Sequence, residues 1–132
     1  MSSKKSQIFI SYSRANRTIA EQLTRVLEQQ GLSVWVDYKT LKGGSTWEDE
    51  VENALRNADI FVTILSKESV NSNWVHAETG YALSLKKRII PILVEDVRLP
   101  LNLSNIQYLD ARKLRVDELG KTVAAAIEKR TK

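Results

Sequence analysis

The sequence contains no cysteine and only one histidine among its 132 residues. Without cysteine, the chain can form neither a disulfide framework nor a thiolate metal site. Because His76 is the only imidazole, a zinc site or a catalytic triad built on histidine lacks the second group it would need. We therefore expect no metal and no bound cofactor, and we interpret His76 as a surface residue.

Long apolar runs and glycine-rich phosphate motifs are also missing. The longest apolar runs, such as residues 89–94, are far too short to span a bilayer. Residues 1–6 are polar and basic, without the apolar core of a signal peptide. We expect these six residues to be a disordered tail, and the protein to be cytoplasmic with no membrane partner. Neither GxGxxG nor GxxxxGKS occurs, which excludes a Rossmann fingerprint or a P-loop.

The net charge of +4 invites a nucleic-acid interpretation, but its distribution argues against one. The basic residues are spread along the chain rather than gathered in one block, and several lie next to acids. This pattern is typical of solvated helix faces. We therefore do not expect a nucleic-acid partner, although the basic surplus could help hold an anionic small molecule such as a pyrophosphate.

Apolar segments with the period of strands alternate with segments that have the period of helices. Strands are predicted at residues 7–12, 33–36, 59–65, 88–94 and 106–109. Four helices are predicted between and after them: one ending at Gly31, one capped by Ser45 or Thr46, one from Ser72 or Asn73 to about Lys87, and one from Val116. Pro91 conflicts with this scheme, because proline cannot donate to a sheet ladder and normally occupies edge strands.

This alternation predicts an α/β fold with right-handed crossovers and a parallel sheet. We expect a flavodoxin-like five-stranded sheet of order 2-1-3-4-5, flanked by helices on both faces. Ligands of such sheets bind at the carboxyl ends of the strands, where the strand order reverses. That position brings residues 11–16, 37–45 and 65–78 around one crevice. A phosphorylated receiver domain has the same order, but its acceptor aspartate is missing, since the third strand ends Ile64-Leu65-Ser66.

The third helix carries a carboxylate in its apolar stripe. At about 100° per residue, Trp74, Glu78, Tyr81 and Leu85 lie on one side of the helix, and His76 lies opposite. Burying an ionised carboxylate is costly unless a partner compensates. Glu78 therefore has a structural partner such as Arg or Lys, reaches solvent with its head, or faces a cavity where a ligand binds.

Aromatic residues gather near the expected crevice. Tyr12, Trp35, Tyr38, Trp47 and Trp74 lie at strand ends or at the helix starts beside them. Such rings can stack on flat heterocycles. Core packing is the alternative, and it is the interpretation we favour for Trp35.

Taken in order, these segments resemble a TIR domain over residues 7–129. Ile8 to Tyr12 is similar to the opening strand of that family. Residues 34–37, with the loop through Gly44, are similar to its second strand and BB loop. Residues 47–55 are similar to its second helix. Residues 59–66 are similar to its third strand, and Trp74 to Glu78 contains the WxxxE pattern of its NAD+-cleaving members. The resemblance implies one TIR domain over residues 7–132.

The resemblance also implies an activity and a set of site residues. NAD+-cleaving members split the nicotinamide–ribose bond, giving nicotinamide and ADP-ribose or a cyclic ADP-ribose isomer, so NAD+ is a substrate rather than a cofactor. Glu78 matches the catalytic carboxylate and Trp74 an aromatic that stacks on a base. The other matching positions are Ser11, Tyr12 and Arg14 on the first-strand wall and Asp37, Tyr38 and Leu41 on the BB-loop side. Trp47 joins them as a substrate-binding candidate from its place beside the crevice.

Family members differ in whether they are enzymes. Many animal TIR domains are scaffolds that bind other TIR domains, whereas many bacterial and plant members cleave NAD+, usually after self-association through the BB loop. Glu78 favours the enzyme, acting in immune-defence or effector signalling. A non-enzymatic scaffold and a nucleotide-binding sensor or base-exchange enzyme remain the alternatives.

Overall fold

The computed structural model of the chain describes residues 6–36 and 47–128 and contains one parallel sheet. Its strands are β1 (Gln7–Ser11), β2 (Ser33–Trp35), β3 (Ile60–Leu65), β4 (Arg88–Leu93) and β5 (Leu109–Asp110). All neighbouring strands are parallel, and their order is β2-β1-β3-β4-β5. The predicted flavodoxin-like order is therefore confirmed, with the reversal between β1 and β3.

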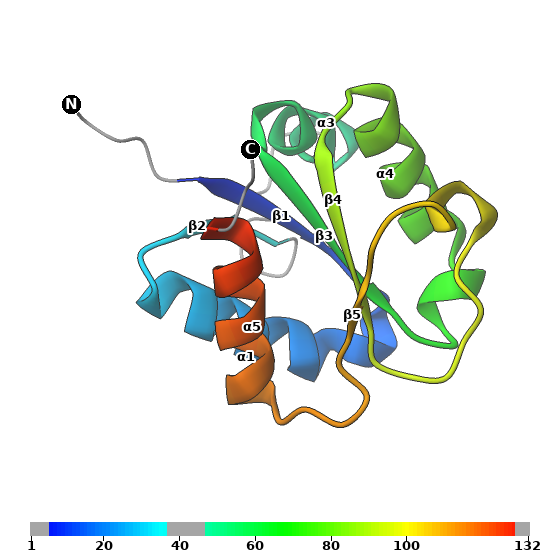
Figure 1. Cartoon of the computed structure of the whole chain (residues 1–132). Coiled ribbons are helices and arrows are strands. Elements are labelled where there is room, and N and C mark those ends of the chain that lie inside the picture. The colour runs from blue at the N-terminus through cyan, green and yellow to red at the C-terminus, as the bar shows by residue number, and fades with distance from the viewer. Residues whose placement is uncertain (1–5, 37–46, 129–132) are drawn as a thin grey trace.

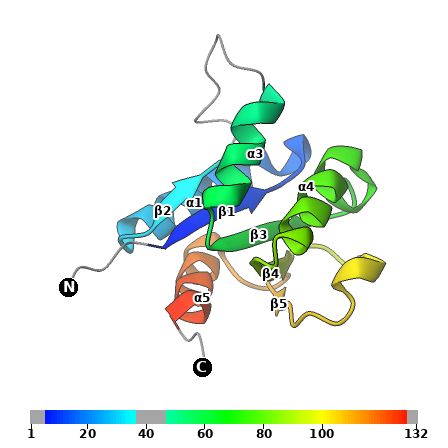
Figure 2. The same cartoon turned by 90° about the horizontal axis from the view of Figure 1, so that it is seen from above.

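Helices cover both faces of this sheet (Figures 1 and 2). The α-helices are α1 (Arg17–Gln29), α3 (Trp47–Asn57), α4 (Asn73–Ser84) and α5 (Val116–Glu128), with short 3-10 helices η1 (Arg14–Asn16), η2 (Ser69–Asn71) and η3 (Leu101–Leu103). Buried side chains of α1 and α5 pack on one face, and those of α3 and α4 pack on the other. No helix within the described ranges has the length and apolarity needed to cross a membrane.

Alternation along the strands builds a separate core on each face. In β3, Ile60, Val62 and Ile64 face α1 and α5, whereas Phe61 and Leu65 face α3 and α4. All six residues of β3 are buried, which confirms the prediction of a central strand covered on both sides.

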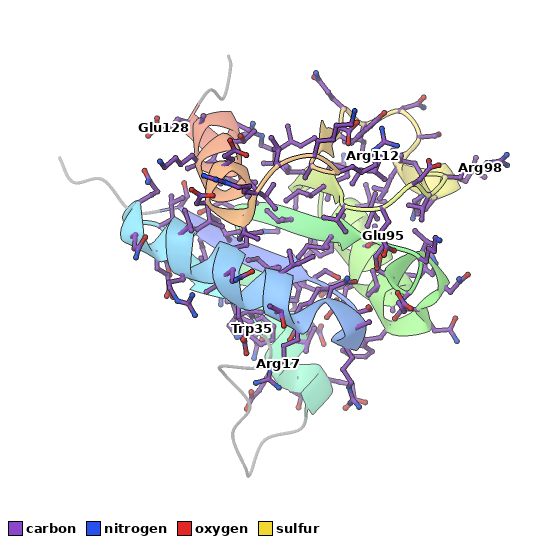
Figure 3. The ribbon with its side chains drawn as sticks, turned by 90° about the horizontal axis from the view of Figure 1, so that it is seen from below. Arg17, Trp35, Glu95, Arg98, Arg112 and Glu128 are labelled. Atoms are coloured by element: carbon purple, nitrogen blue, oxygen red, sulfur yellow. The ribbon has the colours of Figure 1, made fainter. Side chains whose placement is uncertain are left out.

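Trp35 belongs to the core on the α3 and α4 face, as its alternative interpretation predicted (Figure 3). Its ring stacks on Phe9 with centroids 4.8 Å apart, and Phe9 stacks in turn on Phe61 at 5.6 Å. This aromatic row joins β2, β1 and β3 beneath α3 and stabilises the sheet by burying large apolar rings.

Two helix boundaries have the expected local causes. Gly31 follows α1 with a φ of 88°, a left-handed conformation that glycine adopts without steric cost. Ser72 precedes α4 and accepts a hydrogen bond from the Val75 amide at 3.2 Å, which satisfies one of the free donors of the first turn. The cap predicted for the second helix, Ser45 or Thr46, lies outside the described residues.

Two predicted boundaries were wrong. The last strand comprises Leu109–Asp110, not residues 106–109, because the Ile106 amide donates to the Leu103 carbonyl in the turn after η3 and is drawn off the sheet. Helix α4 ends at Ser84 rather than near Lys87. There Lys86 adopts a φ of 58°, and the Lys87 amide bonds back to the Ala82 carbonyl, which turns the chain into β4.

The pairing of β4 with its neighbours explains how the sheet accommodates Pro91. Pro91 is buried opposite Thr63 of β3. On the other side, β5 pairs only with Ile92 and Leu93, so no backbone of β5 lies opposite Pro91. At this position β4 is an edge strand, where the missing N–H costs little.

Candidate active site between α3 and α4

Glu78 lies buried at the carboxyl end of β1. Its side chain is 5% exposed, and its Oε1 accepts a hydrogen bond of 2.6 Å from the hydroxyl of Ser11. Ser11, the last residue of β1, is itself 1% exposed. The distance is that of a hydrogen bond between a hydroxyl and an ionised carboxylate. Ser11 is thus a structural partner of Glu78, and it fixes one oxygen of the carboxylate at the sheet edge where ligands of such folds bind.

The same glutamate lines a pocket of about 230 Å³ between α3 and α4. Within the described part of the chain, two aromatic rings, three carboxylates and three small or aliphatic side chains form its wall. The lining residues are Glu48, Val51, Glu52 and Leu55 of α3, with Trp74, Ala77, Glu78 and Tyr81 of α4. A cavity of this size and apolar character suits a single flat ring.

A hydrogen-bonded triad closes one side of the pocket. Tyr81 donates its hydroxyl to Glu52 Oε2 at 3.1 Å and accepts a hydrogen bond from Arg56 Nε at 3.1 Å. Arg56 also forms an ion pair of 2.7 Å with Glu52. The hydrogen bond to Tyr81 is the main cause of a raised pKa of Arg56. The triad joins α3 to α4 and holds the Tyr81 ring in the pocket wall.

A second polar cluster ties the turn after β1 to the end of β3. Asn16 Oδ1 accepts hydrogen bonds from the hydroxyls of Ser66 at 2.5 Å and Ser13 at 3.1 Å. Ser66 and Ser69 add two mutual backbone–hydroxyl bonds of 2.8 and 3.1 Å. All four side chains are buried. The cluster holds η1 and η2 together at the carboxyl edge, so Ser11 and the start of α4 keep their relative positions.

Residues 8–124 match the family model described as TIR domain. The chain belongs to the TIR domain family. Among its relatives, the NAD(+) hydrolase SARM1 of Danio rerio is 31% identical over 94 residues, 64% of this chain and 13% of that protein. The 2' cyclic ADP-D-ribose synthase AbTIR of Acinetobacter baumannii is 28% identical over 90 residues, 64% of this chain and 34% of that protein. The matches to these relatives thus span about a third of their length or less.

A solved structure has the same fold. The TIR domain of the Toll-related receptor TRR-2 of Hydra magnipapillata superposes with a TM-score of 0.80 at 22% identity, covering 92% of this chain and 98% of that one. At this identity the likeness establishes the fold. The likeness to enzymes of the family comes from the curated relatives, which are an NAD+ hydrolase and a cyclic ADP-ribose synthase.

Within this TIR domain, the predicted site residues fall into three groups. Glu78 and Trp74 line the pocket between α3 and α4, and Ser11 is hydrogen-bonded to Glu78 without lining the pocket itself. Tyr12 packs partly against the core on the α1 and α5 face, and Arg14 is exposed in η1. The roles predicted for the remaining residues stay predictions: Asp37, Tyr38 and Leu41 lie outside the described residues, and Trp47 begins α3 with a side chain that is likewise outside them.

Sequence reasoning missed Glu48, Glu52 and Tyr81 as site residues. Their signal was present in the helical period, since Glu48, Val51, Glu52 and Leu55 share one face of α3. Tyr81 had been assigned to the stripe of Glu78 but only as an apolar neighbour.

His76 is not the surface residue that was predicted. It is half-buried, and its Nε2 lies 2.6 Å from the carbonyl oxygen of Val70. A proton on Nε2 is donated to that oxygen, which fixes the end of η2 against α4. Among the residues that the structure describes, no three His, Cys, Asp or Glu side chains are grouped so that they could hold a metal ion.

Proposed function

We propose that this TIR domain cleaves the nicotinamide–ribose bond of NAD+, with Glu78 as the catalytic carboxylate. The observation that carries the proposal is the position of Glu78: it is buried, hydrogen-bonded to Ser11 at 2.6 Å, and lines a ring-sized pocket with Trp74 and Tyr81. The NAD+-cleaving relatives support the same reaction.

The chemistry suits a site with one carboxylate and no histidine. In NAD+ the leaving ring is a pyridinium cation, so it needs no general acid. When the bond between C1' and the ring nitrogen breaks, its electron pair moves onto the ring, which leaves as neutral nicotinamide. Positive charge then develops on the ribose, and a fixed carboxylate in a water-poor site stabilises it.

The second product depends on what attacks C1'. Attack by water gives ADP-ribose and releases a proton, whereas attack by another oxygen of the same molecule gives a cyclic isomer. In either case we expect Trp74 and Tyr81 to hold the nicotinamide ring and Glu78 to face the ribose, since all three line the same pocket.

The direct test is nicotinamide release from NAD+ by the purified chain, with the second product identified by chromatography. We further propose that self-association through the BB loop raises activity, so release per chain should increase with protein concentration and with a crowding agent. No release from a sample shown to self-associate would favour the scaffold, whose function is to bind other TIR domains.

Replacing Ser11 with alanine should slow the reaction without abolishing it. The substitution removes the hydroxyl that orients Glu78, and losing one such hydrogen bond costs about 1–1.5 kcal/mol, or roughly tenfold in kcat. KM should change little, because Ser11 does not line the pocket. Steady-state kinetics of nicotinamide release measures both quantities.

The matched control is Ser13→Ala, which deletes a neighbouring buried hydroxyl bonded to Asn16 rather than to Glu78. Both variants should lose about 1 kcal/mol of stability. If Ser13→Ala lowered kcat as much as Ser11→Ala, general loosening of this edge would be the cause, and Ser11 would have no special role.

A further inference from the structure

The pocket between α3 and α4 has a one-sided charge. Among the residues that the structure describes, its lining includes three carboxylates, from Glu48, Glu52 and Glu78, and no lysine, arginine or histidine. The aromatic rings of Trp74 and Tyr81 add negative faces that attract cations. The lining therefore favours a positively charged flat ring and disfavours a phosphate.

The three carboxylates differ in what already compensates them. Glu78 is held by the Ser11 hydroxyl, and the charge of Glu52 is offset by the ion pair with Arg56 and the hydrogen bond from Tyr81. Glu48 is exposed at the start of α3 and forms no hydrogen bond or ion pair with another described side chain. Among the described residues, no hydroxyl or cationic side chain therefore compensates the charge of Glu48.

We propose that Glu48 selects the charge of the ring that enters this pocket, favouring an N-substituted pyridinium over a neutral ring of the same shape. The inference rests on the proposed function and specifies the substrate class: oxidised, cationic pyridinium nucleotides rather than their reduced, neutral forms. Across a partly solvated pocket, attraction between two unit charges is modest but sufficient to discriminate.

The position of Glu48 determines which kinetic constant it affects. During cleavage the positive charge leaves the ring and develops on the ribose beside Glu78. Glu48 therefore attracts the substrate before reaction and loses that attraction as the ring becomes neutral, so it strengthens substrate binding without stabilising the transition state. Because the nicotinamide product is neutral, Glu48 attracts it less than the cationic substrate and does not hinder its release.

Asp49 provides a control that distinguishes charge selection by Glu48 from a purely structural role. Glu48, Asp49 and Glu50 all lie in the first turn of α3, where acids stabilise a helix by interacting with its dipole. Asp49 is exposed like Glu48, but it does not line the pocket. Asp49→Asn thus removes the same helix stabilisation as Glu48→Gln without changing the pocket.

Two small probes isolate ring charge from ring shape. 1-Methylnicotinamide is a permanent cation, and 3-methylbenzamide is its neutral isostere. We expect the wild type to bind the cation more tightly, as followed by titration in nuclear magnetic resonance spectra. In Glu48→Gln the ratio of the two affinities should fall by about three- to fivefold, with the neutral probe unaffected. Asp49→Asn should keep the wild-type ratio. Added salt should reduce the ratio of the two affinities in the wild type.

The outcomes separate this inference from the proposed function. An unchanged ratio in Glu48→Gln, or no preference for the cation in the wild type, overturns the role of Glu48 even if nicotinamide is released from NAD+. Failure of the wild type to bind either probe overturns it as well. A ratio that falls as expected, in a protein that releases no nicotinamide, upholds charge selection and contradicts the proposed reaction. Where NAD+ is cleaved and bond cleavage limits the rate, Glu48→Gln should raise KM and kcat by the same factor and leave kcat/KM unchanged, because only the bound substrate loses an attraction.

Discussion

Replacing Glu78 with glutamine is expected to lower nicotinamide release from NAD+ by about a thousandfold. Glutamine has the size of glutamate and can still accept the Ser11 hydroxyl through its side-chain carbonyl. The variant therefore keeps the geometry of the site and loses only the negative charge. Because that charge stabilises the developing cation on the ribose, the loss falls on kcat rather than on KM. Release is measured by chromatography at the protein concentration where the wild type is most active.

Glu128→Gln provides the matched control for this experiment. Glu128 is exposed at the end of α5, on the face of the sheet opposite the pocket (Figure 3). The control should retain full activity, and both variants should unfold near the wild-type temperature. Residual release above a tenth of the wild-type rate in Glu78→Gln would contradict the catalytic role of this carboxylate.

Replacing Gly120 with alanine should destabilise the protein, which is the second large effect that we expect. Gly120 is buried in α5, and a Cβ there would lie 2.3 Å from Val26 Cγ1 and 2.6 Å from Val26 Cβ. Such distances force α5 and α1 apart, which costs about 1–3 kcal/mol even after alanine's better helix propensity. Urea denaturation of the wild type and the variant measures the difference in free energy of unfolding.

Replacing Gly80 with alanine should instead increase the free energy of unfolding. Gly80 is exposed in α4, and a Cβ there would meet nothing within 4 Å. Alanine should therefore stabilise this helix by about 0.5–1 kcal/mol, the difference in helix propensity between the two residues. In addition, Val26→Ala should recover part of the loss in Gly120→Ala, since it removes the nearer atom. Equal stabilities of Gly120→Ala and Gly80→Ala would refute close packing of α1 and α5.

Features with local causes were predictable from the sequence. Alternation of apolar residues identified β3 as a buried central strand, Gly31 ended α1, and Ser72 capped α4. The same helical period placed Glu78 in an apolar stripe and thereby singled it out. Strand order followed because parallel strands joined by right-handed crossovers allow few arrangements.

Boundaries that depend on distant contacts were missed. Residues 106–108 have the composition of a strand, yet the turn after η3 takes up the Ile106 amide and shortens β5 to two residues. Pro91 looked incompatible with an interior strand, and only the register of β5 showed that no donor is needed there.

The sequence by itself determined the parallel α/β fold, the family and the carboxylate on which the proposed reaction depends, because period, capping and motif order are local properties of the chain. Only the tertiary structure decided what surrounds that carboxylate. Ser11 and Glu78 are 67 residues apart. In the pocket, Glu48 and Glu52 come from α3, whereas Glu78 and both aromatic rings come from α4. Such neighbours are chosen by how helices pack on a sheet, which no local pattern specifies.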